Sequence, residues 1–298
     1  MTELARLVVE GVALGGAYGL VALGFVVIAK ATGVVNFAQG TFLALGAYLT
    51  YNGAVTWGLW FPLAAALAVA ASAGAGAGLE RLVVRRLAAR PPHAAIMATI
   101  GVAVAGDQVI TMVWGFDHHP IGDPWGASSL RLGGVSVATV DVAVLAVTVV
   151  VVAAGAVFFA RSRLGLAMRA RAADGELAVA CGIPVHAVDA LAWALGAGLA
   201  ALAGVLLAAG TATARPDLGL AALRAFPAVI LAGFASVPGA LVGGLVVGLV
   251  EVLTAGYAPV HAPWLGVNVH QVAPYAVMLV VLWLRPAGLF TASPARRW

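Results

Sequence analysis

Long apolar stretches without charged residues dominate the chain and predict membrane-spanning helices. They cover residues 11–29, 31–79, 142–160, 190–214, 225–250 and 252–284. A helix needs about 20 mostly apolar residues to cross the hydrocarbon of a bilayer, so each stretch can hold one crossing and the second can hold two. Strands of a membrane barrel would alternate apolar and polar residues, and these stretches do not. The pattern therefore predicts an all-α integral membrane protein.

The charges between the apolar runs set the boundaries of the individual spans. We expect spans near residues 7–29, 34–51, 59–79, 94–114, 140–160, 188–210, 223–235, 238–256 and 271–285. The segment 223–235 is too short for a simple span and could be re-entrant. The prediction is a polytopic bundle of about 8–10 transmembrane helices, taken as a single transmembrane domain over residues 1–298.

Composition excludes a soluble globular protein. Only 9% of the 298 residues are charged, 63% are hydrophobic, and the mean hydropathy is +1.04. A soluble domain carries about 25% charged residues. The net charge of +4 could suggest nucleic acid, but in a membrane protein basic residues are expected on cytoplasmic loops. We therefore expect membrane lipid around the chain and no nucleic acid as a partner.

The basic residues predict the orientation. They cluster in the loops 81–90 and 161–171 and in the tail after residue 284. If these segments and Lys30 are inside, the basic residues left outside are Arg6, Arg131, Arg215 and Arg224. The positive-inside rule then predicts an external N-terminus and a cytoplasmic C-terminus across nine crossings.

Amide side chains lie inside the predicted span 34–51. On a continuous helix one face would hold Asn36, Gln39, Gly40, Leu43, Ala47 and Thr50. Amides are costly in a membrane and usually face the bundle interior or a water-filled cavity. Two interpretations of Asn36 and Gln39 are open: hydrogen bonding between helices, and lining of a translocation path.

Carboxylates also fall within predicted spans, and an intramembrane carboxylate suggests a functional role by default. Asp107 and its neighbour Gln108 lie within 94–114, and Glu251 lies late in 238–256. Asp107 could form a structural pair with a neighbouring amide, which we favour, or take part in a proton relay, and Glu251 could lie at the outer interface. We expect no lysine or arginine partner inside the spans.

No enzyme signature is present in the sequence. A phosphate-binding loop needs G-x-x-x-x-G-K-[ST], but the only lysine, Lys30, stands between two alanines. The chain has neither His-Glu-x-x-His nor Gly-x-Ser-x-Gly, and Cys181 is its single cysteine. We therefore expect no enzymatic activity, no cofactor and no metal site in this chain.

The loop 161–186 carries the most specific motif. It reads RSRLGLAMRARAADGELAVACGIPVH, which is typical of a short amphipathic helix bounded by Gly182 and Pro184. Glu176, Ala178 and Gly182 match E-x-A-x-x-x-G, and this resembles the coupling loop of ABC importer permeases. More specifically, RARAADGELAVACGI is similar to R-A-x-A-x-D-x-x-x-A-x-x-x-G-I of branched-chain amino acid permeases.

Three further segments resemble the same family in the same order. They are VVNFAQG within 33–47, AFPAVILAGFASVPGALVGGLVVGLVE at 225–251, and the tail RPAGLF at 285–290. The resemblance covers most of the chain. Two departures leave the substrate open: AGFAS at 232–236 replaces a glycine-rich segment, and Gly175 stands after Asp174 where helix formers are common.

The resemblance implies the permease subunit of an ABC importer in the cell (inner) membrane, transporting branched-chain or related amino acids. Its partners would be two cytoplasmic ATPase subunits that bind the ATP, a second permease subunit, identical or homologous, and an external solute-binding protein. The positions implied for ATPase coupling are Arg171, Asp174, Glu176, Ala178 and Gly182. Asn36 and Gln39 would lie near the translocation path, and Asp107 and Gln108 are further candidates for it.

Two other classes of protein compete with this interpretation. A self-sufficient secondary transporter or channel, for a small solute such as an amide or urea, would work without ATPase subunits. An integral membrane enzyme would need a reactive constellation at a membrane face. Uptake by this chain alone in vesicles would favour the first of these over the importer.

Overall fold

The computed structural model describes residues 2–88, 90–126, 128–132, 135–234, 236–266, 268–285 and 288–289. Within them, six helices are long and apolar enough to cross a membrane. They are α1 (Thr2–Thr32), α3 (Phe61–Leu79, extended to Leu87 through the π-helical η2, Glu80–Val84, and α4, Arg85–Leu87), α5 (Pro92–Trp114), α6 (Thr139–Arg161), α9 (Val185–Gly210) and α12 (Val237–His261). The predicted all-α polytopic membrane fold is confirmed.

The other helices are shorter. They are α2 (Gln39–Tyr51) with its π-helical continuation η1 (Asn52–Thr56), α7 (Arg163–Ala173), α8 (Gly175–Ala180), η3 (Pro216–Leu220), α10 (Ala221–Arg224), α11 (Phe226–Ala232), η4 (Pro263–Leu265) and α13 (Val269–Leu284). Two small antiparallel pairs complete the described elements: β1 (His119–Pro120) with β4 (Thr213–Ala214), and β2 (Ser129–Leu132) with β3 (Val135–Ala138).

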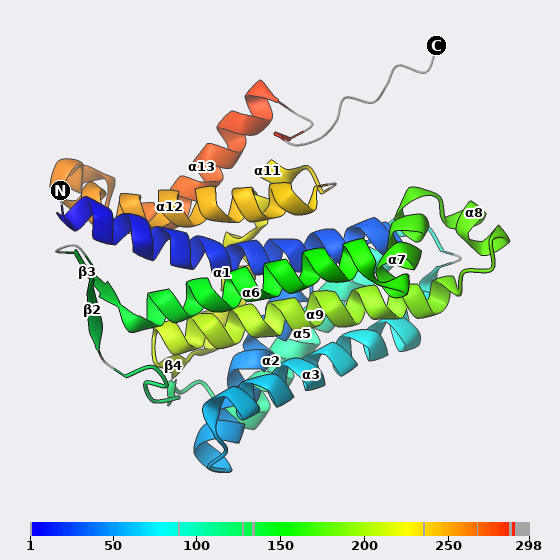
Figure 1. The fold of residues 1–298 in the computed structure, drawn as a ribbon, viewed down its shortest axis with the longest axis horizontal. Helices are drawn as coiled ribbons and strands as arrows, with labels where there is room; N and C mark the ends of the chain where they lie inside the picture. The colour runs from blue at the N-terminus through cyan, green and yellow to red at the C-terminus, as the bar shows by residue number, and fades with distance from the viewer. Residues whose placement is uncertain are drawn as a thin grey trace.

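Helix α1 is the central helix of the bundle. It packs along α12 on one side and along α9 on another, while α9 also contacts α2 and α3 (Figure 1). Of the most apolar 18-residue window of α1, 83% is buried, against 11% for α5 and for α6. The helices α5 and α6 therefore lie at the periphery and present apolar side chains outward.

The bundle has two distinct ends. At the end we call the hairpin end, Arg6 and Glu10 of α1 line a pocket with the start of α6 and the end of α9. At the end we call the coupling-loop end, Lys30 of α1 lies near α7, the end of α6 and the start of α12. The chain between α9 and α12 therefore returns from the hairpin end to the coupling-loop end.

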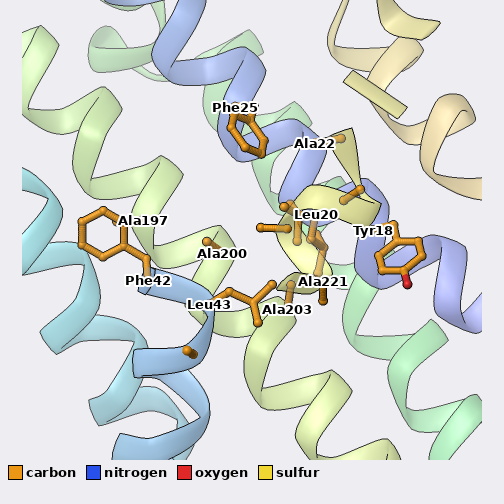
Figure 2. Close-up of a cluster of buried hydrophobic side chains, with 14 of the residues drawn as sticks. Tyr18, Leu20, Ala22, Phe25, Phe42, Leu43, Ala197, Ala200, Ala203 and Ala221 are labelled. Carbon is orange, nitrogen blue, oxygen red and sulfur yellow. The ribbon is translucent and has the colours of Figure 1, made fainter. Parts of the chain in front are cut away.

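A core of alanines and a few larger side chains fills the space between α1, α2, α9 and α10. Figure 2 shows Leu20 and Phe25 of α1, Leu43 of α2 and Ala200 of α9 within this cluster. Leu20, Leu43 and Ala200 are fully buried, and Phe25 is 3% exposed. Small side chains on α9 let its neighbours approach closely, which is how helices associate in lipid.

Glycines make the closest of these contacts. A Cβ on Gly15 of α1 would lie 2.7 Å from Leu245 Cα of α12. One on Gly46 of α2 would lie 2.6 Å from Ala201 Cα of α9, and one on Gly204 of α9 would collide with the Leu43 carbonyl of α2. No side chain fits at these positions, so the α1–α12 and α2–α9 distances depend on glycine.

Two predicted spans are interrupted. The span 34–51 begins as a helix only at Gln39, because residues 33–38 leave the helical path. Asn36 therefore does not share a helix face with the residues that follow it. The predicted span 223–235 is divided into α10 and the seven-residue α11, so this pass is discontinuous and contains no complete spanning helix.

Some predicted features lie outside the described residues. These are residue 235 of the predicted span 223–235, residues 286, 287 and 290 of the tail motif, and the basic residues at 296 and 297.

We expect Gly204→Val to destabilise the protein by about 1–3 kcal/mol, because overpacking forces α2 and α9 apart. The measurement is the thermal unfolding midpoint of the purified protein in detergent. Gly74→Val is the matched control, since a Cβ on Gly74 meets no atom within 4 Å. Equal midpoints for the two variants would contradict close α2–α9 packing.

Candidate functional site

The break before α2 has local causes. Gly33 takes a φ of +70°, a left-handed conformation that favours glycine, and its N–H donates to the Ala29 carbonyl at 2.8 Å, which ends α1. The Asn36 side-chain oxygen accepts from the Ala38 N–H at 3.0 Å. A side chain thus satisfies the N–H of Ala38, the residue directly before α2, while the first turn of α2 itself has no side-chain cap.

The two amides predicted in this segment bond to each other and to α9. Asn36 Nδ2 donates to Gln39 Oε1 at 3.0 Å, and Gln39 Nε2 donates to the Gly196 carbonyl at 3.0 Å. Both side chains are fully buried. A Cβ on Gly24 of α1 would collide with Gln39 Nε2, so Gln39 is enclosed between α1 and α9. This geometry favours bonding between helices over direct contact with a solute.

The two interrupted segments, the start of α2 and the segment from η3 to α11, contact each other. A Cβ on Gly40 of α2 would lie 2.6 Å from the Gly219 carbonyl of η3. The rings of Phe37 and Phe226 have centroids 6.2 Å apart, and Phe226 also packs edge-on against Phe25 at 5.7 Å. The start of α2 and the start of α11 therefore share one aromatic cluster, in which Phe37 is exposed.

Asp107 and Gln108 lie on the peripheral helix α5, and both side chains are exposed. Thr41 Oγ1, near the start of α2, donates to Asp107 Oδ1 at 3.1 Å. On the same helix, Val104 is 60% exposed and Met112 is 85% exposed. Polar residues exposed on an apolar membrane helix usually face water or another protein.

Glu251 is buried and paired, at 6% exposed. Tyr18 Oη of α1 donates to Glu251 Oε2 at 2.9 Å, and Arg224 Nη1 lies 4.0 Å from Glu251 Oε1. The expectation that no basic partner is available inside the spans was therefore wrong. Arg224, which we expected outside, closes α10 and reaches this carboxylate, so it attaches the interrupted segment to α12.

The coupling loop forms two helices where one was expected. Asp174 separates them: its Oδ1 accepts from the Glu176 and Leu177 N–H groups, both at 3.0 Å, and so caps α8. Ala178 is buried, and Gly182 has a φ of +78° just after α8. The residues of the E-x-A-x-x-x-G pattern other than Glu176 thus have local structural roles.

Arg171 turns inward. Its Nε donates to Asp189 Oδ1 at 3.1 Å and its Nη2 to Asp189 Oδ2 at 3.3 Å, a two-pronged ion pair that attaches α7 to α9. Nearby, Arg85 Nη2 lies 2.7 Å from Glu80 Oε2 and donates to the His186 carbonyl at 3.0 Å. The Arg171–Asp189 pair therefore fixes α7 to the start of α9, and the Arg85–His186 hydrogen bond fixes the start of α9 to the end of the α3 helix.

A continuous surface remains exposed on α8 and the turn after it. We call it the loop face, and it consists of Glu176, Leu177, Val179 and Cys181. Leu177 is 61% exposed and Val179 is 56% exposed. Two large exposed apolar side chains on a short helix, next to a helix that an ion pair attaches to α9, are suited to docking against another protein.

Sequence reasoning did not identify Asp189, Glu80, Arg85 and Tyr18 as partners. The only available signal was that charged or phenolic side chains occur at span ends or within apolar runs. Among the described residues, no group of three or more His, Cys, Asp or Glu side chains could hold a metal ion. The arrangement leaves an exposed apolar surface on α8 and joins α7 to α9 and α9 to α2 through side-chain contacts.

The comparisons with known proteins agree on one family. Residues 7–282 match the family model described as branched-chain amino acid transport system / permease component. The high-affinity branched-chain amino acid transport system permease protein LivH of Escherichia coli is 29% identical, covering 94% of this chain and 93% of LivH. The high-affinity branched-chain amino acid transport system permease protein BraD of Pseudomonas aeruginosa is 29% identical over 94% of each chain. No solved structure matches significantly.

We expect Gln39→Leu to destabilise the protein by about 1–3 kcal/mol, because it leaves the buried Asn36 amide without its acceptor and removes the bond to Gly196. The measurement is the unfolding midpoint in detergent. Gln108→Leu is the control, because the Gln108 side chain is exposed on α5 and forms no side-chain hydrogen bond among the described residues. A Gln39→Leu variant as stable as the control would contradict the structural role.

Proposed function

This chain belongs to the branched-chain amino acid permease family, and on that premise we propose that it is the transmembrane subunit of an ABC importer for branched-chain or related amino acids. The observation that carries the proposal is the family match over residues 7–282, together with an exposed loop face beside α7, which the Arg171–Asp189 pair attaches to α9. The relatives' names describe branched-chain amino acid transport permeases.

The loop face is the proposed docking surface for a cytoplasmic ATPase subunit. Leu177 and Val179 would insert into an apolar groove on the ATPase, and Glu176 would lie at the rim of that contact. Asp174, Ala178 and Gly182 shape the surface from within, and Arg171 holds it to α9. ATP would be bound by two partner subunits, and this chain itself would need no cofactor.

Movement of the docked loop would reach the centre of the bundle through α9. Arg171 joins α7 to Asp189 near the start of α9, and Gly196 on the same helix holds Gln39 at the start of α2. A rigid-body shift of α9 would therefore move the interrupted segment. Discontinuous helices that move as units are the usual basis of alternating access.

The exposed side of α5 is the proposed wall of the translocation path. Asp107 and Gln108 would face a second permease subunit, identical or homologous, with the path between the two chains. Asn36 and Gln39 would position the start of α2 behind this wall. A path with few polar groups suits a solute with an aliphatic side chain, which an external binding protein would deliver.

The test is reconstitution of this chain with its ATPase subunits and binding protein in vesicles. We expect leucine uptake that depends on ATP, and we expect Leu177→Glu to reduce uptake and ATPase attachment by about tenfold or more, because it places a charge in the apolar contact. Leu177→Met is the matched control and should retain both. Uptake by the chain alone would contradict the importer and favour a self-sufficient transporter.

Cys181 provides a test of the orientation. It is the single cysteine of the chain and is exposed on the loop face. We expect a membrane-impermeant maleimide to label it in inverted vesicles and to leave it unlabelled in intact cells. Cys181→Ser serves as the blank. Labelling in intact cells would place the loop outside, where no ATP-driven partner could reach it.

A further inference from the structure

The start of α8 holds a glycine that the local backbone does not require. Gly175 is the first residue of α8 and follows Asp174, whose side chain caps the helix. The φ of Gly175 lies outside the left-handed region, so another residue could adopt the same conformation. Glycine is also among the poorest helix formers. The reason for a glycine at this position must therefore lie in the space around it.

The guanidinium of Arg171 lies in that space. A Cβ on Gly175 would collide with Arg171 Nη1 and would lie 3.2 Å from Arg171 Cζ. The other two guanidinium nitrogens, Nε and Nη2, donate to the two carboxylate oxygens of Asp189. Nη1 is therefore the corner of the guanidinium that faces the start of α8, while the opposite edge holds α9.

The Arg171 guanidinium has little freedom to move away from Gly175. The end of an arginine side chain shifts easily in general, but here two hydrogen bonds in a rigid fork hold it. The Arg171 side chain is 25% exposed and that of Asp189 is 14% exposed. Opening the pair would leave a largely buried carboxylate without its partner, which is costly. A methyl group on Gly175 would therefore either break the pair or push α8 away from it.

We infer that Gly175 is a positioning residue for coupling, because its lack of a side chain lets the Arg171 guanidinium contact the start of α8 while it holds Asp189. Helix α8 carries the loop face, and α9 carries the Gly196 carbonyl that accepts from Gln39. Arg171 therefore links the docking surface to α9 directly, in addition to the link through α7. The coupling role rests on the proposed function, whereas the contact between Gly175 and the ion pair does not.

A double-mutant cycle on the purified chain in detergent tests the contact. We expect Gly175→Ala to lower the unfolding midpoint, although helix propensity alone predicts a rise. Asp189→Asn should also lower the midpoint, because Arg171 loses its charged partner. Together the two substitutions should lower it no further than Asp189→Asn alone, since the released guanidinium can turn away from the new methyl group.

Gly78→Ala on α3 is the matched control for the cycle, because a Cβ on Gly78 meets no atom within 4 Å. Its effect on the midpoint should be the same with and without Asp189→Asn. A higher midpoint for Gly175→Ala than for the wild type would overturn the contact. Additive effects of Gly175→Ala and Asp189→Asn would overturn it as well.

A second experiment tests coupling in vesicles that contain the chain, its ATPase subunits and the binding protein. We expect Gly175→Ala to lower the amount of leucine imported per ATP hydrolysed by about fivefold or more, the size of a typical coupling between two sites. ATPase attachment should be unchanged, because Gly175 is not part of the loop face. Adding Arg171→Lys to Gly175→Ala should raise the ratio again, because lysine keeps the charge toward Asp189 and has no Nη1 to collide.

The outcomes separate the coupling role from the contact. Gly78→Ala should leave the ratio of import to hydrolysis unchanged. An unchanged ratio in Gly175→Ala, a loss of ATPase attachment, or no recovery with Arg171→Lys would each overturn the coupling role. If the wild type imports no leucine, the proposed function is wrong and the coupling role falls with it, while the cycle decides the contact independently.

Discussion

Close contact between helix backbones is the constraint on which the other features of this protein depend. Lipid is as apolar as leucine, so membrane helices associate through packing and hydrogen bonds and not through exclusion of water. Here α1 lies against α12 at Gly15 and against α9 at Gly24, where the Gln39 amide fills the space that a side chain would need. With larger residues at these positions, α2 could not start between α1 and α9.

The interrupted segments become possible inside this close packing. Polar backbone groups freed at a helix break must find partners within the protein, because the hydrocarbon offers none. The Asn36 side chain supplies one acceptor, and the Gln39 side chain extends the hydrogen bonding to the Gly196 carbonyl. The second interrupted segment is held by the Arg224–Glu251 pair and by Tyr18. Both breaks are therefore stabilised by polar contacts that cross between helices.

The sequence predicts the six long helices, because each is a long apolar run bounded by charges or prolines. Most ends agree to within a few residues, but α1 begins at Thr2 where residue 7 was expected, the α3 helix extends to Leu87 where 79 was expected, and α12 ends at His261 where 256 was expected. The sequence does not predict the break before α2, since residues 33–38 are as apolar as the helix around them and hydropathy carries no information about backbone direction. Gly33 and Asn36 were the available signals, and each also occurs in continuous helices.

Hydrogen-bond partners on different helices could not be predicted from the sequence, for a different reason. Gln39 and Gly196 are 157 positions apart, and Tyr18 and Glu251 are 233 apart. No helical periodicity connects such positions, so only the packing of whole helices reveals them. Arg171 illustrates the same limit at short range, because its motif position suggested the loop surface and its side chain turns inward to Asp189.

The ion pairs at the coupling-loop end orient the neighbouring helices more than they stabilise the fold. Removing a charged pair from water costs much of what the pair gains, so a half-buried pair such as Glu80–Arg85 is weak support for stability. The pair instead helps to orient the start of α9, because Arg85 also donates to the His186 carbonyl. Arg171 binds Asp189, three residues further along the chain. The loop therefore cannot rotate without moving the start of α9. Because α9 also provides the acceptor for Gln39, the surface that would receive the ATPase and the interrupted helix α2 are connected through one rigid element.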